Sequence, residues 1–176
     1  MMADTTAIGT MTADLPEFAD LVRAYQRMVF SIAYHFLHDR AGAEDIAQEV
    51  FLQLHRTLSS LKSEAHIRAW LCKVTSHRCI DYARSRKADL PLDRIPEPVS
   101  KPSSGDPLMA ALVQRAVASL PPKVRIVVVL RYQEDLEPAE IARVLGLRVN
   151  TVKSQLHRSL DILRQKLGGT LGDVES

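Results

Sequence analysis

Four side chains that can bind DNA lie close together near the end of the chain. Lys153, Ser154, His157 and Arg158 recur at steps that put them on one side of a helix. Lys and Arg neutralise phosphates, and hydrogen-bonding side chains can reach base edges in the major groove. These residue types at this spacing predict a DNA-binding helix.

The sequence around these residues predicts the elements that position them. A short helix begins at Pro138, and Gly146 follows it as the residue best suited to a left-handed backbone at a helix end. A second helix begins by about Asn150, and its apolar stripe consists of Val152, Leu156, Leu160, Leu163 and Leu167. The pattern is typical of a DNA-binding helix-turn-helix. An amphipathic helical hairpin with a solvated charged face is the alternative.

A second candidate nucleic-acid surface lies on a predicted helix over residues 65–86. Its basic residues, with the following lysine, are Arg68, Lys73, Arg78, Arg84, Arg86 and Lys87. Trp70, Lys73 and His77 share one face with Asp81 and Arg84, and such a face suits phosphates and unpaired bases. Trp70 is equally compatible with a core anchor, and the charges with a solvated face.

A predicted helix over residues 41–58 has an unusual outer face. Ile46, Val50 and Leu54 point to one side and predict the packed face. The opposite side carries Asp45, Gln48, Glu49, Leu52 and Arg56. A leucine set among acidic and polar residues suggests a protein-docking surface, although an ordinary charged surface is the alternative.

The whole chain is predicted to be all-α, with two small helical bundles joined by a proline-rich linker. The expected parts are a disordered tail 1–14, a first module 15–87, a linker 88–107, a helix-turn-helix module 108–167 and a tail 168–176. Residues 124–132 have the β-branched composition of a strand. We expect a helix there, because two prolines begin it and an isolated strand would have no partner. The second module should bury a core of its own.

Composition limits the classes of function. The 176 residues carry a net charge of only +2, so affinity for nucleic acid must come from local clusters of Lys and Arg. No signal peptide and no apolar run of about 18 residues is visible, which predicts a cytoplasmic protein without membrane insertion. Cys72 and Cys79 lie about 10 Å apart along one predicted helix, so we expect unreactive thiols, with no disulfide and no bound metal.

With these features in place, the chain resembles the extracytoplasmic-function (ECF) sigma factors of the sigma-70 family. The first module carries the resemblance in AEDIAQEVFLQLHR (43–56) and RAWLCKVTSHRCIDYARSRK (68–87). The second carries it from residue 119 to residue 167. The resemblance implies a non-enzymatic, cofactor-free protein that binds core RNA polymerase, directs it to the −10 and −35 elements of promoters and promotes DNA opening. It also implies that an anti-sigma factor holds the protein inactive.

The resemblance assigns roles to matching positions. Docking on the β′ clamp helices of polymerase falls to Asp45, Gln48, Glu49 and Leu52. The linker would run through the polymerase toward the RNA exit path, and the β subunit is a further expected partner. Contact with the −10 element falls to Lys73, His77, Arg78 and Arg84. Contact with the −35 element falls to Thr151, Lys153, Ser154, Gln155, His157 and Arg158. His77 stands where the family usually has Asn, Gln155 where it often has Arg, and Glu137 in place of a Ser helix cap.

Other classes of protein fit less well. A response regulator would need a receiver domain of alternating strands and helices, which the first module does not predict. An enzyme would need a phosphate loop, metal-ligand spacing or a nucleophile–base pair. Two further alternatives are another helix-turn-helix regulator and a sigma-like polymerase partner that does not melt promoters.

Overall fold

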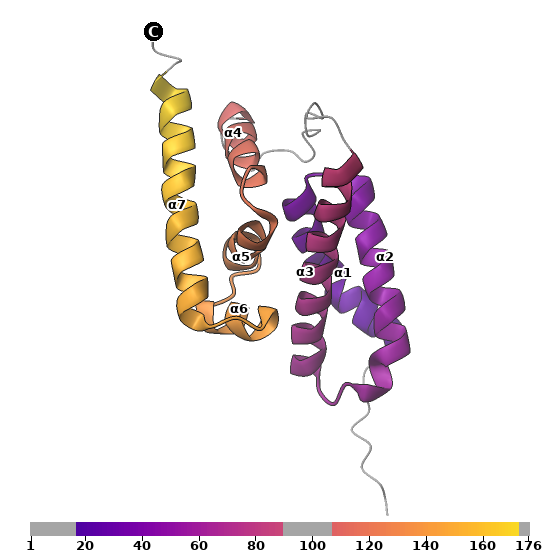
Figure 1. Ribbon diagram of the computed structural model, residues 1–176. Coiled ribbons are helices and arrows are strands. Elements are labelled where there is room, and N and C mark those ends of the chain that lie inside the picture. The colour runs from indigo at the N-terminus through magenta and orange to yellow at the C-terminus, as the bar shows by residue number, and fades with distance from the viewer. Residues whose placement is uncertain (1–16, 90–106, 173–176) are drawn as a thin grey trace, which may run out of the picture.

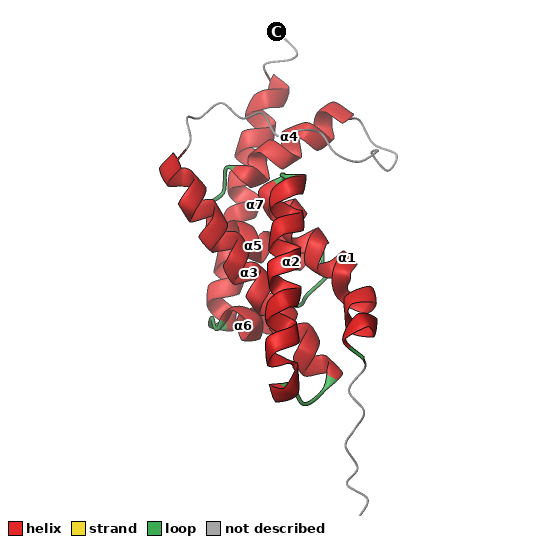
Figure 2. Ribbon diagram, turned by 90° about the vertical axis from the view of Figure 1, so that its right-hand side faces the viewer, coloured by secondary structure: helices red, strands yellow, loops and turns green. Residues whose placement is uncertain are grey.

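The computed structural model describes residues 17–89 and 107–172, and within them every regular element is helical (Figure 2). The first group comprises α1 (Phe18–Leu37), α2 (Arg40–Thr57), a short 3-10 helix (Leu58–Ser60) and α3 (Glu64–Asp89). The second comprises α4 (Pro107–Ala118), α5 (Pro122–Tyr132), α6 (Pro138–Leu145) and α7 (Val149–Gly172). The all-α prediction is confirmed for this part of the chain. Most of the predicted linker and the first tail lie outside the described residues.

The break between α1 and α2 follows from its local sequence. His38 ends α1 in the left-handed conformation, at φ 52°, and its N–H donates to the Tyr34 carbonyl. Asp39 then caps α2, because its Oδ1 accepts a hydrogen bond from the Gly42 N–H at 3.3 Å. This cap begins α2 with only two residues between it and the end of α1.

Helix α5 confirms the helix expected for the strand-like segment. Pro122 occupies its first turn, and all five residues from Ile126 to Leu130 are buried. A helix normally hides one face, but α5 lies between α7 on one side and α1 and α3 on the other (Figure 1). Burial all round explains why its sequence lacks helical amphipathicity.

The helix-turn-helix forms as predicted from α6, a turn and α7. Gly146 adopts a left-handed conformation at φ 67°, which a side chain would disfavour. At the start of α6, the Glu137 N–H donates to Glu140 Oε2 at 2.8 Å, so this helix end is held without the usual Ser. Helix α7 continues past Leu167 to Gly172, beyond the predicted end of the module.

The sequence analysis predicted that the second module buries a core of its own, and in the structure that core is continuous with the core of the first module. Most of the buried apolar residues of the second module belong to one cluster that also contains the core of α1–α3, whereas Ala116, Leu120 and Val128 are buried outside that cluster. Helix α5 packs on α1 and α3, and helix α6 packs on α3 (Figure 1). Apolar burial therefore joins the two modules in this conformation.

Arg125 of α5 adds polar contacts between the modules. Its guanidinium donates to the Phe36 carbonyl of α1 at 3.2 Å and lies over the Phe36 ring, 5.0 Å from its centroid. The same group donates to the carbonyls of Leu120, at 3.1 Å, and Ala118 at the turn between α4 and α5. One half-buried cation thus connects α1 to that turn.

His38 lies near Arg125 and makes the stability of the fold depend on pH. The side chain is 8% exposed, and among the described residues its ring nitrogens have no hydrogen-bond partner. Burial above all, with the positive charges of His35 and Arg125, lowers the pKa of His38 from 6.5 to about 4. The folded chain therefore holds a neutral imidazole at pH values where the unfolded chain would protonate it.

We expect this imidazole to lower stability in acid. Unfolding takes up a proton between the two pKa values, so the contribution of His38 is complete above about pH 7 and is lost as the pH falls toward 4. The loss should reach about 2 kcal/mol at pH 5. Urea unfolding at pH 7.5 and pH 5 should show it, with His38→Asn as the control, since Asn tolerates the left-handed backbone. Equal pH dependence in the two proteins would contradict the assignment.

Candidate protein-docking and nucleic-acid interfaces

The outer face of α2 has the geometry of a docking surface. The four side chains predicted there, Asp45, Gln48, Glu49 and Leu52, are all exposed on the side of α2 that faces away from the core. Leu52 is 61% exposed, whereas Val50 and Leu54 are completely buried. The predicted separation of the two faces of α2 is therefore confirmed.

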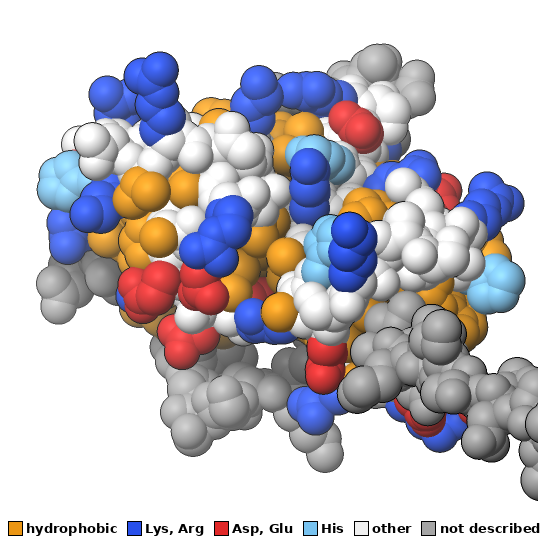
Figure 3. All heavy atoms as spheres, turned by 90° about the horizontal axis from the view of Figure 1, so that it is seen from below, with side chains coloured by type: hydrophobic (Ala, Val, Ile, Leu, Met, Phe, Trp, Pro, Cys, Tyr) orange, Lys and Arg blue, Asp and Glu red, His pale blue; other side chains and the backbone are white. Residues whose placement is uncertain are grey.

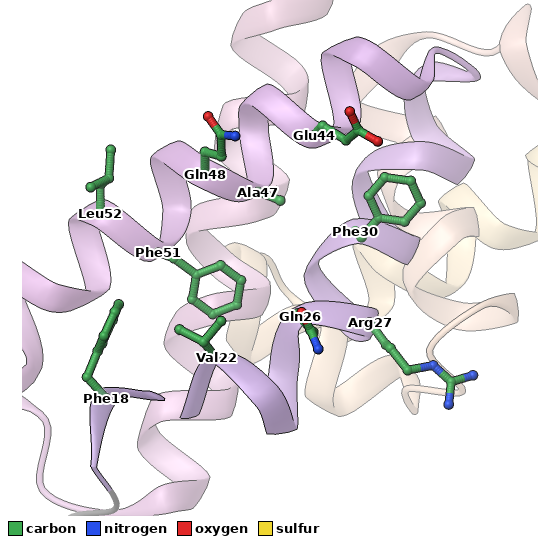
Figure 4. A pocket seen from close by; sticks show the side chains of 10 residues that line it. All are labelled: Phe18, Val22, Gln26, Arg27, Phe30, Glu44, Ala47, Gln48, Phe51 and Leu52. Atoms are coloured by element: carbon green, nitrogen blue, oxygen red, sulfur yellow. The ribbon is translucent and has the colours of Figure 1, made fainter. Parts of the chain in front are cut away.

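An apolar groove lies beside this face, and the sequence analysis did not predict it. It has a volume of about 710 Å³ and runs between α1 and α2 (Figure 4). Its apolar lining comes from Phe18, Val22, Phe30, Ala47, Phe51 and Leu52. The signal was present as a row of apolar residues on α1, but periodicity alone does not distinguish a core face from a groove.

The predicted −10 residues lie on α3. Lys73, His77, Arg78 and Arg84 are all exposed, as a nucleic-acid surface requires. Trp70 is half-buried and packs against the apolar cluster, which favours its alternative role as a core anchor. Base stacking by Trp70 is therefore not part of the candidate site.

Two of the predicted surfaces are joined by an ion pair. Arg78 Nη1 on α3 lies 2.9 Å from Glu49 Oε2 on α2, and Arg78 Nη2 donates to Gln53 Oε1 at 3.3 Å. Sequence analysis had placed Arg78 with the −10 residues and Glu49 with the docking residues. Both side chains are about half exposed, so the pair is open to exchange with other partners.

The predicted −35 residues lie along the first half of α7. Thr151, Lys153, Ser154, His157 and Arg158 are exposed. His157 Nε2 lies 3.6 Å from Asp161 Oδ2, one turn further along the helix. These side chains form one exposed row on the recognition helix.

Gln155 does not belong to the exposed row. Its side chain is only partly accessible, and its Oε1 is buried with no hydrogen-bond partner among the described residues. It lies beside Val152 and Ser159, both completely buried. The resemblance had assigned Gln155 to the −35 contacts, whereas the helical spacing had placed only Lys153, Ser154, His157 and Arg158 on the polar face.

Positive charge is distributed rather than concentrated. On the face seen in Figure 3, Lys and Arg side chains are scattered among apolar and uncharged ones and form no single patch. This agrees with the small net charge of +2. Each candidate DNA surface therefore offers only a few cations, and neither is suited to strong binding by itself.

The cysteines have no place in these surfaces. Cys72 and Cys79 are free and buried. Burial raises the pKa of Cys72 to about 11 and that of Cys79 to about 12, so both are neutral thiols at physiological pH. Within the described residues, no three His, Cys, Asp or Glu side chains are grouped to hold a metal, and no helix is long and apolar enough to cross a membrane.

Comparison with known proteins covers both modules. The family model of sigma-70 region 2 matches residues 21–88, and that of sigma-70 region 4 matches residues 110–163. The chain is 30% identical over 169 residues to the ECF RNA polymerase sigma factor SigW of Bacillus subtilis, covering 88% of this chain and 90% of that protein. It is also 30% identical over 174 residues to the ECF RNA polymerase sigma factor SigE of Mycolicibacterium smegmatis, covering 92% and 67%.

The fold has a counterpart among solved structures. The sigma factor RpoE of Bartonella quintana, crystallised in complex with the anti-sigma factor NepR, superposes with a TM-score of 0.73 at 16% identity. The match covers 88% of this chain and 98% of that one. At this identity the likeness concerns the fold of the two helical modules.

Proposed function

Because the chain belongs to the ECF sigma factors of the sigma-70 family, which direct RNA polymerase to promoters, we propose that its exposed faces divide this task among them. The α2 face docks on core polymerase, the α3 face engages the −10 element, and the α7 row reads the −35 element. A sigma factor is not an enzyme, so each role is one of binding. The observation that carries the proposal is the exposure of all three faces on one folded chain.

Docking on polymerase uses the acidic face of α2. Asp45 and Glu49 supply negative charge, while Gln48 and the exposed Leu52 supply hydrogen-bonding and apolar contact. The partner is the pair of β′ clamp helices, which must then present basic and apolar side chains. An exposed leucine at such a centre contributes apolar area that no intramolecular contact uses.

Engagement of the −10 element uses Lys73, His77, Arg78 and Arg84. Arg78 can leave Glu49 for a phosphate at little cost, because exposed ion pairs contribute about 0–1 kcal/mol. The exchange would free Glu49 for polymerase at the same time. DNA opening is then supported by capture of unstacked bases, with a few kcal/mol at stake for each base.

Recognition of the −35 element uses the exposed row of α7 in the major groove. Arg158 and Lys153 offer charged donors, while Thr151, Ser154 and His157 offer further hydrogen-bonding groups. Gln155 lies at the edge of this row, where its partly accessible side chain borders the core. Its role within the module is to pack beside Val152.

The two modules act together on promoter DNA. We assign residues 15–87 to polymerase binding and the −10 element, 108–167 to the −35 element, and 88–107 to the linker between them. Polymerase raises the effective concentration of the second DNA contact once the first is made. This explains how two weak surfaces produce one specific complex.

Regulation by an anti-sigma factor is part of the proposal. The fold is shared with RpoE of Bartonella quintana, a sigma factor whose solved complex contains the anti-sigma factor NepR. A protein that covers the α2 face would exclude polymerase by occupying the same side chains.

Reconstituted transcription tests the proposal. The chain, sigma-free bacterial core polymerase and a library of promoter fragments should give initiation from a defined subset that shares two sequence elements. Core binding without initiation would favour the alternative, a sigma-like partner that does not melt DNA, and His77→Asn would then be tested for a gain of initiation. Absence of core binding would remove the polymerase role and leave a helix-turn-helix DNA-binding protein.

A further inference from the structure

The first turn of α7 carries a polar side chain that the local structure does not use. Asn150 is the second residue of the helix and is exposed, and its carboxamide has no hydrogen-bond partner within residues 17–89 and 107–172. The start of the helix is held instead by Arg148, whose carbonyl accepts hydrogen bonds from the N–H groups of Thr151, at 2.9 Å, and Val152, at 3.1 Å. The carboxamide of Asn150 is therefore available to a ligand.

Asn150 lies on the same side of α7 as the row proposed to read the −35 element. At about 100° per residue, Lys153, Ser154 and His157 all project within about 60° of Asn150. The completely buried Val152 projects about 160° away from it, toward the core. Asn150 thus continues the exposed row by one turn toward the start of the helix.

This end of α7 is well placed to meet base pairs. In a helix-turn-helix, the N-terminal residues of the second helix contact base edges in the major groove. Helix α7 forms one edge of the molecule, with α5 and α6 between it and the first module (Figure 1), and residues 147–151 are all exposed. Asn150 and Arg158 lie about 12 Å apart along the helix axis, which is comparable to the rise of three to four base pairs.

The carboxamide of Asn150 fits one base better than the others. Its oxygen can accept a hydrogen bond from N6 of adenine while its nitrogen donates one to N7 of the same base. Guanine presents two acceptors at these places, which suit Arg or Lys instead. The other carboxamide in this half of α7 is that of Gln155, and its Oε1 is buried. Among the side chains of the first half of α7, adenine reading therefore falls to Asn150.

We propose that Asn150 is a further specificity-determining residue, whose carboxamide reads one adenine at the end of the −35 element that meets the start of α7. The inference rests on the proposed function, because it takes the exposed row of α7 as the surface that enters the major groove. It adds a base contact to the one considered for Arg158. The two side chains then contact opposite ends of the same element.

Selection of −35 sequences by the assembled holoenzyme tests the proposal. The −35 element of a transcribed promoter is randomised, and the fragments that the holoenzyme binds are sequenced. We expect Asn150→Ala to lower the preference for adenine at one base pair by about five- to one-hundredfold and to leave the other positions unchanged. Asn150→Asp should favour cytosine at that position, because a carboxylate accepts a hydrogen bond from N4 of cytosine.

The matched control is Gln165→Ala. Gln165 is also an exposed carboxamide on α7, but it lies about 22 Å farther along the helix axis. This variant should select the same sequences as the unaltered chain. Circular dichroism and thermal melting establish that each variant is folded, and Ala is favourable within a helix.

The outcomes separate this inference from the proposed function. Unchanged selection by Asn150→Ala, with a clear −35 preference in the unaltered holoenzyme, would overturn the role of Asn150 and keep the row on α7. Absence of any −35 preference in the unaltered holoenzyme would overturn the two together. An equal loss of binding to all sequences would identify a phosphate contact and overturn adenine reading.

A second measurement changes the DNA and leaves the chain intact. Replacing the selected adenine with 7-deazaadenine removes the N7 acceptor and keeps the base pair. Binding of the unaltered holoenzyme should then fall by about two- to tenfold, whereas the holoenzyme with Asn150→Ala should bind both DNAs equally. Equal losses in the two proteins, or no loss in either, would overturn the proposal.

Discussion

Replacing Asp45 with Arg is expected to abolish binding to core RNA polymerase while the chain stays folded. Asp45 is exposed on α2, among the residues of the proposed docking face. The substitution reverses a charge where the partner must be basic, and opposed like charges across an interface cost several kcal/mol. Binding of labelled protein to core polymerase, followed by fluorescence anisotropy, should fall at least a hundredfold.

The matched control is Asp20→Arg on α1. Asp20 is also exposed and pairs with Arg23 at 3.1 Å, so the same change of net charge is made away from the docking face. Normal binding by Asp20→Arg excludes a general effect of charge. Normal binding by Asp45→Arg would remove the α2 face from the mechanism. Glu49→Lys should also abolish binding, but it breaks the pair with Arg78 and is less decisive.

Much of the fold was predictable because particular residues mark where several of the helices begin or end. Pro122 and Pro138 lie in the first turns of α5 and α6, Asp39 caps α2, and Gly146 ends α6. The apolar period then separates the buried face of α2 from its exposed face. Local signals of this kind act within a few residues, which is the range that sequence analysis covers well.

The contact between the modules was not predictable from the same signals. From the sequence of its own helix, Arg125 is expected to lie on the surface. Its guanidinium nevertheless donates a hydrogen bond to the Phe36 carbonyl, 89 positions earlier in the chain. The prolines before it predicted a helix over Ile126–Leu130, but the burial of all five residues depends on α1, α3 and α7 around that helix. Long-range packing decides both cases, and no local pattern encodes it.

The candidate surfaces show the same limit. Exposure of the α3 and α7 side chains followed from their helical positions. The groove did not, because it needs two helices side by side, and apolar residues on α1 predict a core and a docking groove equally well. The partial burial of Gln155 was not predictable for a related reason, because it depends on how closely α7 packs beside Val152 and Ser159.

The exposed row of α7 leads to a prediction about specificity. Arg158 is exposed beside His157 on the recognition helix, where a guanidinium can bond two acceptors of one guanine. If it reads a base, Arg158→Ala should weaken binding of the holoenzyme to its preferred −35 element by about 1–3 kcal/mol. The variant should also lose discrimination at a single base pair.

A phosphate contact would give a different result. Arg158→Ala would then weaken binding to all sequences alike and reduce the salt dependence by about one counterion. Titrations with the selected promoter and with a scrambled −35 element, each at several salt concentrations, separate the two roles. Arg164→Ala is the control on the same helix, because Arg164 is exposed further along and lies 3.3 Å from Asp161. Equal losses on selected and scrambled DNA would refute base reading by Arg158, whereas a loss confined to the selected element would identify it as a residue that sets promoter choice.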